Sequence, residues 1–156
     1  MKPSDRLKEL GIQLPTVATP IGSYIPALRT GPYVLTSGQI PFRDGKVAFT
    51  GKVSSKTALA QAAEGARISV LNGLAACAQV AGGIDRIARV IRVCVFVNSD
   101  PDFTEHPKVA NGASDLLTQI FGDAGRHARS ALGVSALPLD AVVEVELMVE
   151  LQPDPR

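Results

Sequence analysis

Apolar and polar residues follow two rhythms along the chain, and the slower rhythm predicts helices. Over residues 56–80, apolar side chains recur every three or four positions, which is the spacing of one helical face, and a Gly-Gly pair ends the pattern. A second stretch of this kind covers residues 107–121 and also stops at a glycine. A short helix is predicted near the N-terminus, over residues 4–10.

The faster rhythm consists of alternation and of short runs of β-branched residues, and it predicts strands. Its strongest example is residues 89–97. Residues 23–29 and 33–37 form two further candidates joined by a Thr-Gly-Pro turn, and residues 129–137 and 141–151 form two more joined by a Pro-Leu-Asp turn. If this last turn makes its two strands pair, the chain ends in a β-hairpin.

The predicted elements follow the order ββ-α-β-α-ββ, which fits an α+β two-layer sandwich of one mixed sheet with two helices on one face. The other face would then stay uncovered, although it carries many apolar side chains, so we expect it to be buried by self-association in a closed ring. We expect one domain over residues 1–156, with an N-terminal extension over 1–19 and a core over about 20–151.

The composition limits the classes of partner. Apolar residues make up 46% of the 156 residues, aromatic residues 4%, and the formal net charge is +1 with a pI near 7.8. This balance gives no broad basic surface for nucleic acids or membranes, and no apolar run approaches the length that spans a membrane. We therefore expect neither a nucleic acid nor a membrane among the partners.

The cysteines and histidines give little sign of metal or redox chemistry. Cys77 and Cys94 each lie in an apolar stretch without a CxxC pair, so we expect reduced core residues in a cytoplasmic protein. His106 and His127 are the only histidines, and their spacing is not that of metal ligands. No metal or cofactor is expected.

Candidate chemistry is concentrated in residues 127–146. Arg129 begins one predicted strand, and Glu144 and Glu146 share a face of the next because alternate residues in a strand point the same way. Taken alone, these charges are more typical of a solvated face or an ion pair at a subunit interface. The alternative is a site that binds a carboxylate and has a general acid or base nearby.

Several motifs decide between these alternatives, because together and in order they resemble the Rid/YjgF family, which includes the reactive intermediate deaminases and the L-PSP endoribonucleases. Single motifs such as SGQIP would be weak evidence, but the set spans about residues 20–150. The matching segments are Ile21-Gly22-Ser23-Tyr24, the Thr-Ser-Gly-Gln-Ile-Pro run at 36–41, the strand run at 93–97 with Asp102-Phe103, Arg129-Ser130, Leu137-Pro138 and Val143-Glu144-Val145-Glu146.

The resemblance implies a chorismate mutase-like fold and a homotrimer with small-molecule sites in the clefts between subunits. It also implies hydrolysis of reactive enamines and imines, in which 2-iminoacids become 2-ketoacids and ammonia. By the same resemblance, Arg129 would hold the substrate carboxylate, Glu144 would act as acid and base on a water molecule, and Tyr24 would bind substrate or assist proton transfer. The remaining expected pocket residues are Ser37, Gly38, Ala131 through its backbone and, as a weaker match, Asn111.

The chain departs from the family pattern at the pocket rim. His127 stands where the family usually has Pro or Ala, Ala131 stands where well-studied deaminases carry a cysteine, and residues 104–111 lengthen the chain. Two other functions therefore stay open. One is a non-catalytic trimer that binds a small carboxylate; the other, less consistent with the near-neutral charge and the lack of a histidine pair, is an endoribonuclease.

Overall fold

The computed structural model describes residues 1–20, 22–54 and 59–154. Within these residues it contains three α-helices, three short 3-10 helices and seven strands. The helices are α1 (Pro3–Glu9), α2 (Leu59–Ala81), α3 (His106–Phe121), η1 (Ile84–Arg86), η2 (Gly122–Gly125) and η3 (Pro138–Asp140). The strands are β1 (Ala27–Thr30), β2 (Tyr33–Thr36), β3 (Phe42–Arg43), β4 (Lys46–Val47), β5 (Ile87–Asn98), β6 (Ala128–Val134) and β7 (Val143–Leu151).

Five of the strands form one mixed sheet in the order β1-β2-β7-β5-β6, and β3 and β4 form a separate small hairpin. Strand β7 lies between β2 and β5 and is antiparallel to both, whereas β5 and β6 are parallel. Parallel neighbours need a long crossover connection, and α3 supplies it.

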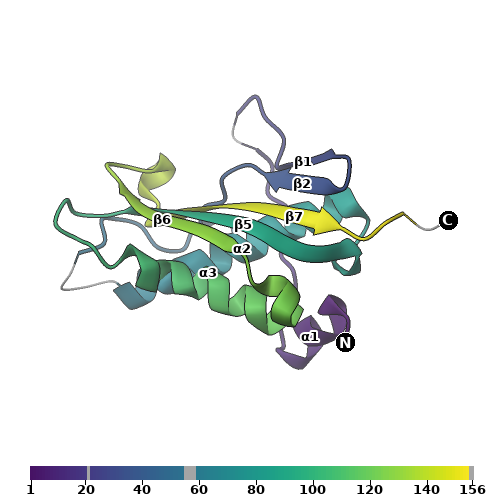
Figure 1. Ribbon diagram of the computed structural model, residues 1–156. Helices are drawn as coiled ribbons and strands as arrows, with labels where there is room; N and C mark the ends of the chain where they lie inside the picture. The colour runs from purple at the N-terminus through teal and green to yellow at the C-terminus, as the bar shows by residue number, and fades with distance from the viewer. Residues whose placement is uncertain (21, 55–58, 155–156) are drawn as a thin grey trace.

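Both long helices cover the same face of this sheet (Figure 1). Helix α2 packs against β7, β1 and β2, and α3 packs against α2, β5 and β6. The core between the layers is aliphatic and includes Val70, Leu74, Val93, Leu117 and Val145. The predicted α+β two-layer sandwich, with one mixed sheet and two helices on one face, is confirmed.

Glycines allow α2 to lie close to β7. A Cβ atom at Gly73 would lie 2.7 Å from Cδ1 of Leu147, and one at Gly65 would lie 3.0 Å from Cγ1 of Val142. Since a side chain at either position would push the helix away from the strand, these two glycines fix the height of α2 over β7.

The predicted element boundaries are close to those observed. The long helix, predicted over 56–80, is described from Leu59 to Ala81, and the first three predicted residues lie outside the described part of the chain. The first strand is shorter than predicted, since it begins only at Ala27.

The possible C-terminal hairpin is wrong. β6 and β7 do not pair, because β5 lies between them and pairs with both. Strand β5 is the longest strand and has buried residues along one face. Its place between β6 and β7 gives it ladder hydrogen bonds on both edges. The buried side chain of Asn98, at the end of β5, donates to the carbonyl of Ala141 and to Oδ1 of Asp140, and so holds the crossing loop.

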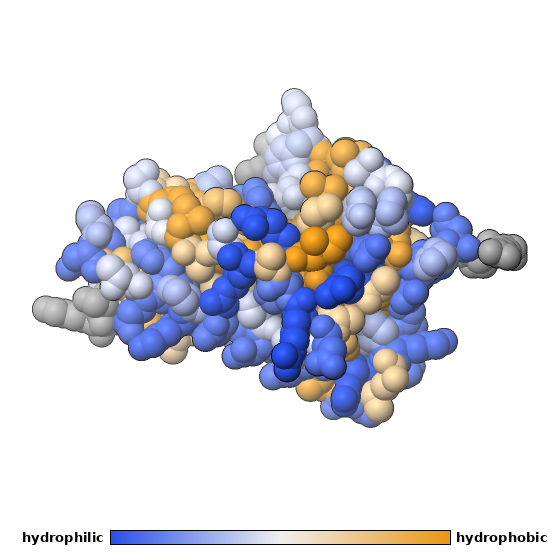
Figure 2. Space-filling view, in the orientation of Figure 1, coloured by the Kyte–Doolittle hydropathy of each residue, from blue (hydrophilic) through white to orange (hydrophobic). Residues whose placement is uncertain are grey.

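The second face of the sheet is open in the single chain. Its side chains include Leu28 (56% exposed), Leu35 (40%) and Leu132 (41%), together with Glu144 and Glu146. Figure 2 shows hydrophobic surface gathered on the upper, sheet side of the molecule and interrupted there by hydrophilic side chains. An apolar face of this kind is unusual for the free surface of a monomer.

Candidate functional site

Glu144 lies near the start of β7, on the open face of the sheet. Its carboxylate packs against the backbone of Gly38: a Cβ atom there would lie 2.6 Å from Cδ of Glu144. Gln39 fixes this contact, because its backbone exchanges two hydrogen bonds of 2.8 Å with Val145. A glycine at position 38 therefore makes room for the carboxylate.

The environment of Glu144 favours its protonated form more than water does. Burial raises the pKa of its carboxyl above the ordinary value, and the charge of Glu146, two residues along the same face, raises it further. A glutamate with a raised pKa exchanges its proton at higher pH than an ordinary glutamate, which is how enzymes adapt a carboxyl group to acid–base catalysis.

Tyr24 and Gly38 line one hollow of about 360 Å³; Glu144 contacts Gly38 but is not among the described residues that line this hollow. Tyr24 is 47% exposed, and its hydroxyl has no hydrogen bond within the described ranges. The hydroxyl of Ser37 donates to the carbonyl of Ile25 at 2.6 Å, and its backbone N–H donates to the carbonyl of Pro26. Ser37 thus fixes the segment that presents Tyr24.

Arg129 lies on the other side of the sheet, at the β6 edge. It is paired in register with Val93 and so belongs to the face that the helices cover. Its Nη1 donates to Oδ1 of Asn111 at 2.8 Å and to Oγ of Ser114 at 3.1 Å, and its Nη2 makes a long contact of 3.5 Å with the carbonyl of Pro107. All three partners lie on one stripe of α3.

Arg129 has no acidic partner among the described residues, although six ion pairs are found there. Among the residues that the structure describes, the groups that accept hydrogen bonds from its guanidinium are all neutral. The described residues therefore form no ion pair with Arg129 inside the chain, and the alternative of an ion pair at a subunit interface stays a prediction.

The sequence prediction named Asn111 but missed Ser114, and it gave His127 no role in the site. Ser114 bonds to both Arg129 and Nε2 of His127, the latter at 2.9 Å. The signal was present in the sequence: positions 107, 111 and 114 recur at helical spacing and so lie on one face of α3.

The structure brings the predicted residues together in two groups and not in one. In the first group, Glu144 contacts Gly38, Ser37 precedes Gly38 in the chain, and Tyr24 shares a hollow with Gly38. Arg129, Asn111 and Ala131 lie on the helix side, with Ala131 paired in register with Val95 and packed against the core. Because the sheet separates the groups, one chain cannot bring Arg129 and Glu144 into the same cavity.

Comparison with known proteins identifies the family. A family described as YjgF/chorismate mutase-like, whose description adds a candidate endoribonuclease activity, matches residues 4–151. This chain belongs to the YjgF/chorismate mutase-like family. The resemblance inferred from the motifs is therefore confirmed, and so is the chorismate mutase-like fold.

Several known proteins are similar to this chain over most of its length. Protein TCP17 of Trypanosoma cruzi is 42% identical over 146 residues, which is 93% of this chain and 91% of the relative. The RutC family protein PH0854 of Pyrococcus horikoshii is 30% identical over 129 residues, 81% of this chain and 86% of its own. A Shewanella oneidensis protein, described as a candidate endoribonuclease, has a crystal structure that is 36% identical, with a TM-score of 0.91 and coverage of 97% and 100%.

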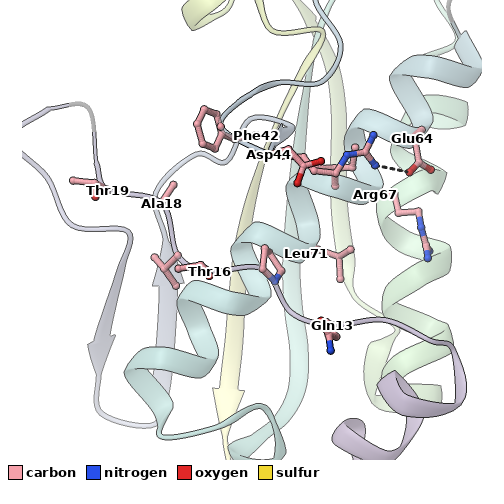
Figure 3. A pocket seen from close by; sticks show the side chains of 14 residues that line it. Gln13, Thr16, Ala18, Thr19, Phe42, Asp44, Glu64, Arg67 and Leu71 are labelled. Atoms are coloured by element: carbon pink, nitrogen blue, oxygen red, sulfur yellow. Dashed lines mark ion pairs between the residues drawn. The ribbon is translucent and has the colours of Figure 1, made fainter.

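A larger groove of about 750 Å³ lies elsewhere in this YjgF-like chain (Figure 3). The extended segment 13–19, the β3–β4 hairpin and α2 form its walls, and Figure 3 shows Arg67, Glu64 and Asp44 around it. It contains none of the predicted site residues, and Arg43 and Glu64 face each other in it at 3.9 Å. Volume alone therefore does not identify the candidate site.

The remaining groups of the YjgF-like chain offer little further chemistry. Cys77 and Cys94 are both free; burial raises the pKa of the Cys77 thiol to about 12, while Cys94 lies half-buried on the open face and not in the core as expected. No cluster of potential metal ligands occurs in the described part of the chain. Nor, across those residues, is any helix long and apolar enough to cross a membrane.

Proposed function

We propose that this protein hydrolyses reactive imines and enamines, converting 2-iminoacids into 2-ketoacids and ammonia, in pockets shared between the subunits of a homotrimer. The observation that carries the proposal is the state of Arg129. Its half-buried guanidinium is held in place by neutral groups, without an acidic partner in the described residues. A cation fixed in this way can take the carboxylate of a substrate.

The reaction needs orientation and proton transfer, and both are available from side chains. With its carboxylate on Arg129, the substrate would present its imine carbon to a water molecule. Water oxygen bonds to that carbon, and the water's two protons end on the new hydroxyl and on the nitrogen. Transfer of the hydroxyl proton to nitrogen then lets ammonia leave as the carbonyl forms. Glu144 would carry these protons, which its raised pKa favours.

A shared pocket follows from the separation of Arg129 and Glu144 by the sheet. If Arg129 of one subunit faces Glu144 of the next, the two groups described above become the walls of one cleft, with Tyr24 and Gly38 on the Glu144 side. The exposed leucines of the open face support the same assembly, since a second copy would cover them. Ser37, Asn111 and the backbone of Ala131 would complete the lining.

Two other functions use parts of the same evidence. A trimer that binds a small carboxylate without turnover would need Arg129 but not Glu144, so the raised pKa of Glu144 favours the enzyme. Endoribonuclease activity appears in the description of the Shewanella oneidensis relative. A net charge of +1 offers little attraction to an RNA backbone, so we place this function last, and the free cysteines lead us to propose a cytoplasmic site of action.

The test is the rate of ketoacid formation from a 2-iminoacid released by a PLP-dependent dehydratase. Wild-type protein should accelerate this step over buffer, and Arg129→Ala should lower kcat/KM by about a hundredfold, the usual scale for removing one partner of a buried charge contact. Arg43→Ala, in the larger groove, is the matched control and should leave the rate unchanged. A wild-type rate equal to that of buffer, with Arg129-dependent binding of a ketoacid, would replace the enzyme by the binder.

A further inference from the structure

A continuous line of hydrogen bonds runs from Gly125 at the end of η2 through His127 and through Ser114 of α3 to Arg129 of β6. Nδ1 of His127 lies 2.6 Å from the carbonyl oxygen of Gly125, and its Nε2 lies 2.9 Å from Oγ of Ser114. Oγ of Ser114 in turn lies 3.1 Å from Nη1 of Arg129, whose other Nη1 partner is Asn111. Both ring nitrogens of His127 are thus engaged by the protein's own groups.

With His127 neutral, the chemistry of these groups gives a direction to every bond in the line. A carbonyl oxygen can only accept, so Nδ1 of His127 carries the hydrogen and donates to Gly125. In the neutral ring Nε2 then has a lone pair, and the hydroxyl of Ser114 donates to it. The lone pairs of Ser114 Oγ are left to accept from Arg129, which can only donate.

The line also determines which edge of the guanidinium is free. Asn111 and Ser114 take both hydrogens of Nη1, while Nε has no hydrogen bond within residues 1–20, 22–54 and 59–154. In the same described ranges, Nη2 makes only the long contact with the carbonyl of Pro107. The Nε–Nη2 edge of Arg129 is therefore open, and two parallel N–H groups on one edge match a carboxylate.

We propose that His127 and Ser114 are positioning residues that hold Arg129 by Nη1 so that its Nε–Nη2 edge faces the substrate carboxylate. This role rests on the proposed function. It explains a histidine at the rim of the site without making it a base, since neither ring nitrogen is free to reach a substrate.

Two substitutions of His127 distinguish its bond to Ser114, which supports Arg129, from its bond to Gly125, which only supports the neighbouring turn. His127→Asn places an amide near the position of Nδ1, so it keeps the bond to Gly125 and loses the acceptor for Ser114. His127→Gln places its carbonyl near the position of Nε2 and keeps that acceptor. We expect His127→Asn and Ser114→Ala each to raise KM about tenfold with kcat within about twofold, the size of one lost hydrogen bond to a charged group.

The remaining variants complete the test. His127→Gln should restore KM to within about threefold of wild type, and the Ser114→Ala/His127→Asn double variant should be no worse than either single one, because the two act through one line of bonds. Arg126→Gln, at an exposed neighbouring arginine, should have no effect. Equal KM values for His127→Asn and wild type would overturn the proposal while leaving the proposed function intact.

A measurement independent of turnover uses the nitrogen NMR signals of His127. We expect the tautomer with hydrogen on Nδ1, and a change in the Nε2 signal in Ser114→Ala; the opposite tautomer would overturn the proposal. Titration with 2-oxobutanoate shows whether the positioning role alone fails or the proposed function fails as well. If wild-type protein neither binds this ketoacid nor accelerates the reaction, the proposed function fails and the positioning role falls with it.

Discussion

The two halves of the proposed site are built in different ways. Around Arg129, one stripe of α3 and a histidine at the β6 edge hold the guanidinium by several hydrogen bonds to neutral groups. Around Glu144, the carboxylate meets the bare backbone of Gly38 and the like charge of Glu146, and its pKa is raised. One half is organised within the chain, and the other half is left without a counter-charge in the described residues.

The difference indicates which groups each half needs from a ligand or from a neighbouring chain. The Arg129 half is ready for an anion, since its geometry is fixed and its charge is not neutralised. The Glu144 half faces the open side of the sheet, where a neighbouring chain would supply the missing groups. Experiments that act on one half and not on the other therefore test this division.

The largest expected effect comes from combining chains that are each damaged in one half. Arg129→Ala and Glu144→Gln should each lose about a hundredfold or more in kcat/KM. When the two variants are mixed in equal amounts and allowed to reassemble, about a quarter of the clefts in a closed ring should receive both intact residues. Activity measured after refolding should therefore recover to about a quarter of the wild-type level.

The control is each variant refolded alone, which should stay inactive. Every chain in the mixture carries one lesion, so a site contained within a single chain could not recover. Absence of recovery in a mixture shown by mass spectrometry to contain hybrid assemblies would contradict the shared site.

The next effect concerns the helix that organises the Arg129 half. A Cβ atom at Gly112 would lie 2.7 Å from the carbonyl carbon of Ala63, so Gly112→Ala must move α3 away from α2. We expect a loss of about 2 kcal/mol in the free energy of unfolding, the scale of an overpacked core. Urea denaturation would measure it, with Lys108→Ala on the exposed side of α3 as control.

Gly112→Ala should also distinguish the halves in kinetics. Because Asn111 and Ser114 flank Gly112 on α3, KM should rise while the pH at which Glu144 titrates should not move. A shift of that pH, with KM unchanged, would mean that the two halves are coupled within one chain.

A smaller effect is expected in the Glu144 half. Gly38→Ala would displace the carboxylate of Glu144, and we expect kcat to fall about tenfold with little change in KM, as for a catalytic group moved by about an ångström. Steady-state kinetics would measure both constants. In a Glu144→Gln background the same substitution should cost nothing further; an additional tenfold loss there would show that Gly38 acts in another way.

The smallest effect is a shift along the pH axis. Glu144 acts as a base only when ionised, and its raised pKa moves that ionisation to higher pH. Glu146→Gln removes one of the two causes, so the acidic limb of kcat/KM should move to lower pH. Burial is the larger cause of the raised pKa and remains in this variant, so the acidic limb should still lie at higher pH than the pKa of an ordinary glutamate. A limb that moves to higher pH would exclude Glu144 as the titrating group.

Much of the fold could be predicted from the sequence because its signals are local. The helical spacing of apolar residues from Leu59 to Ala81 and the β-branched run in β5 define the two layers, and the alternation around Glu144 correctly predicts which side chains of β7 are buried.

The order of the strands could not be predicted in the same way. The Pro-Leu-Asp turn allows a hairpin, and only the pairing of β5 on both edges excludes it. Ser114 was missed for a related reason: helical spacing places it on one face of α3 with Asn111, but that spacing does not show that Arg129 of β6 lies against this face.

The position of β5 between β6 and β7 has a consequence for mixed populations of chains. The single segment from His127 to Glu146 would furnish Arg129 to one cleft of the proposed ring and Glu144 to the neighbouring cleft. A chain that lacks both residues would then inactivate two of the three clefts in the ring, because each of these clefts also uses a residue of an intact neighbouring chain. The share of working clefts would then fall as the square of the share of intact chains, so activity would be lost faster than in proportion to the defective chains.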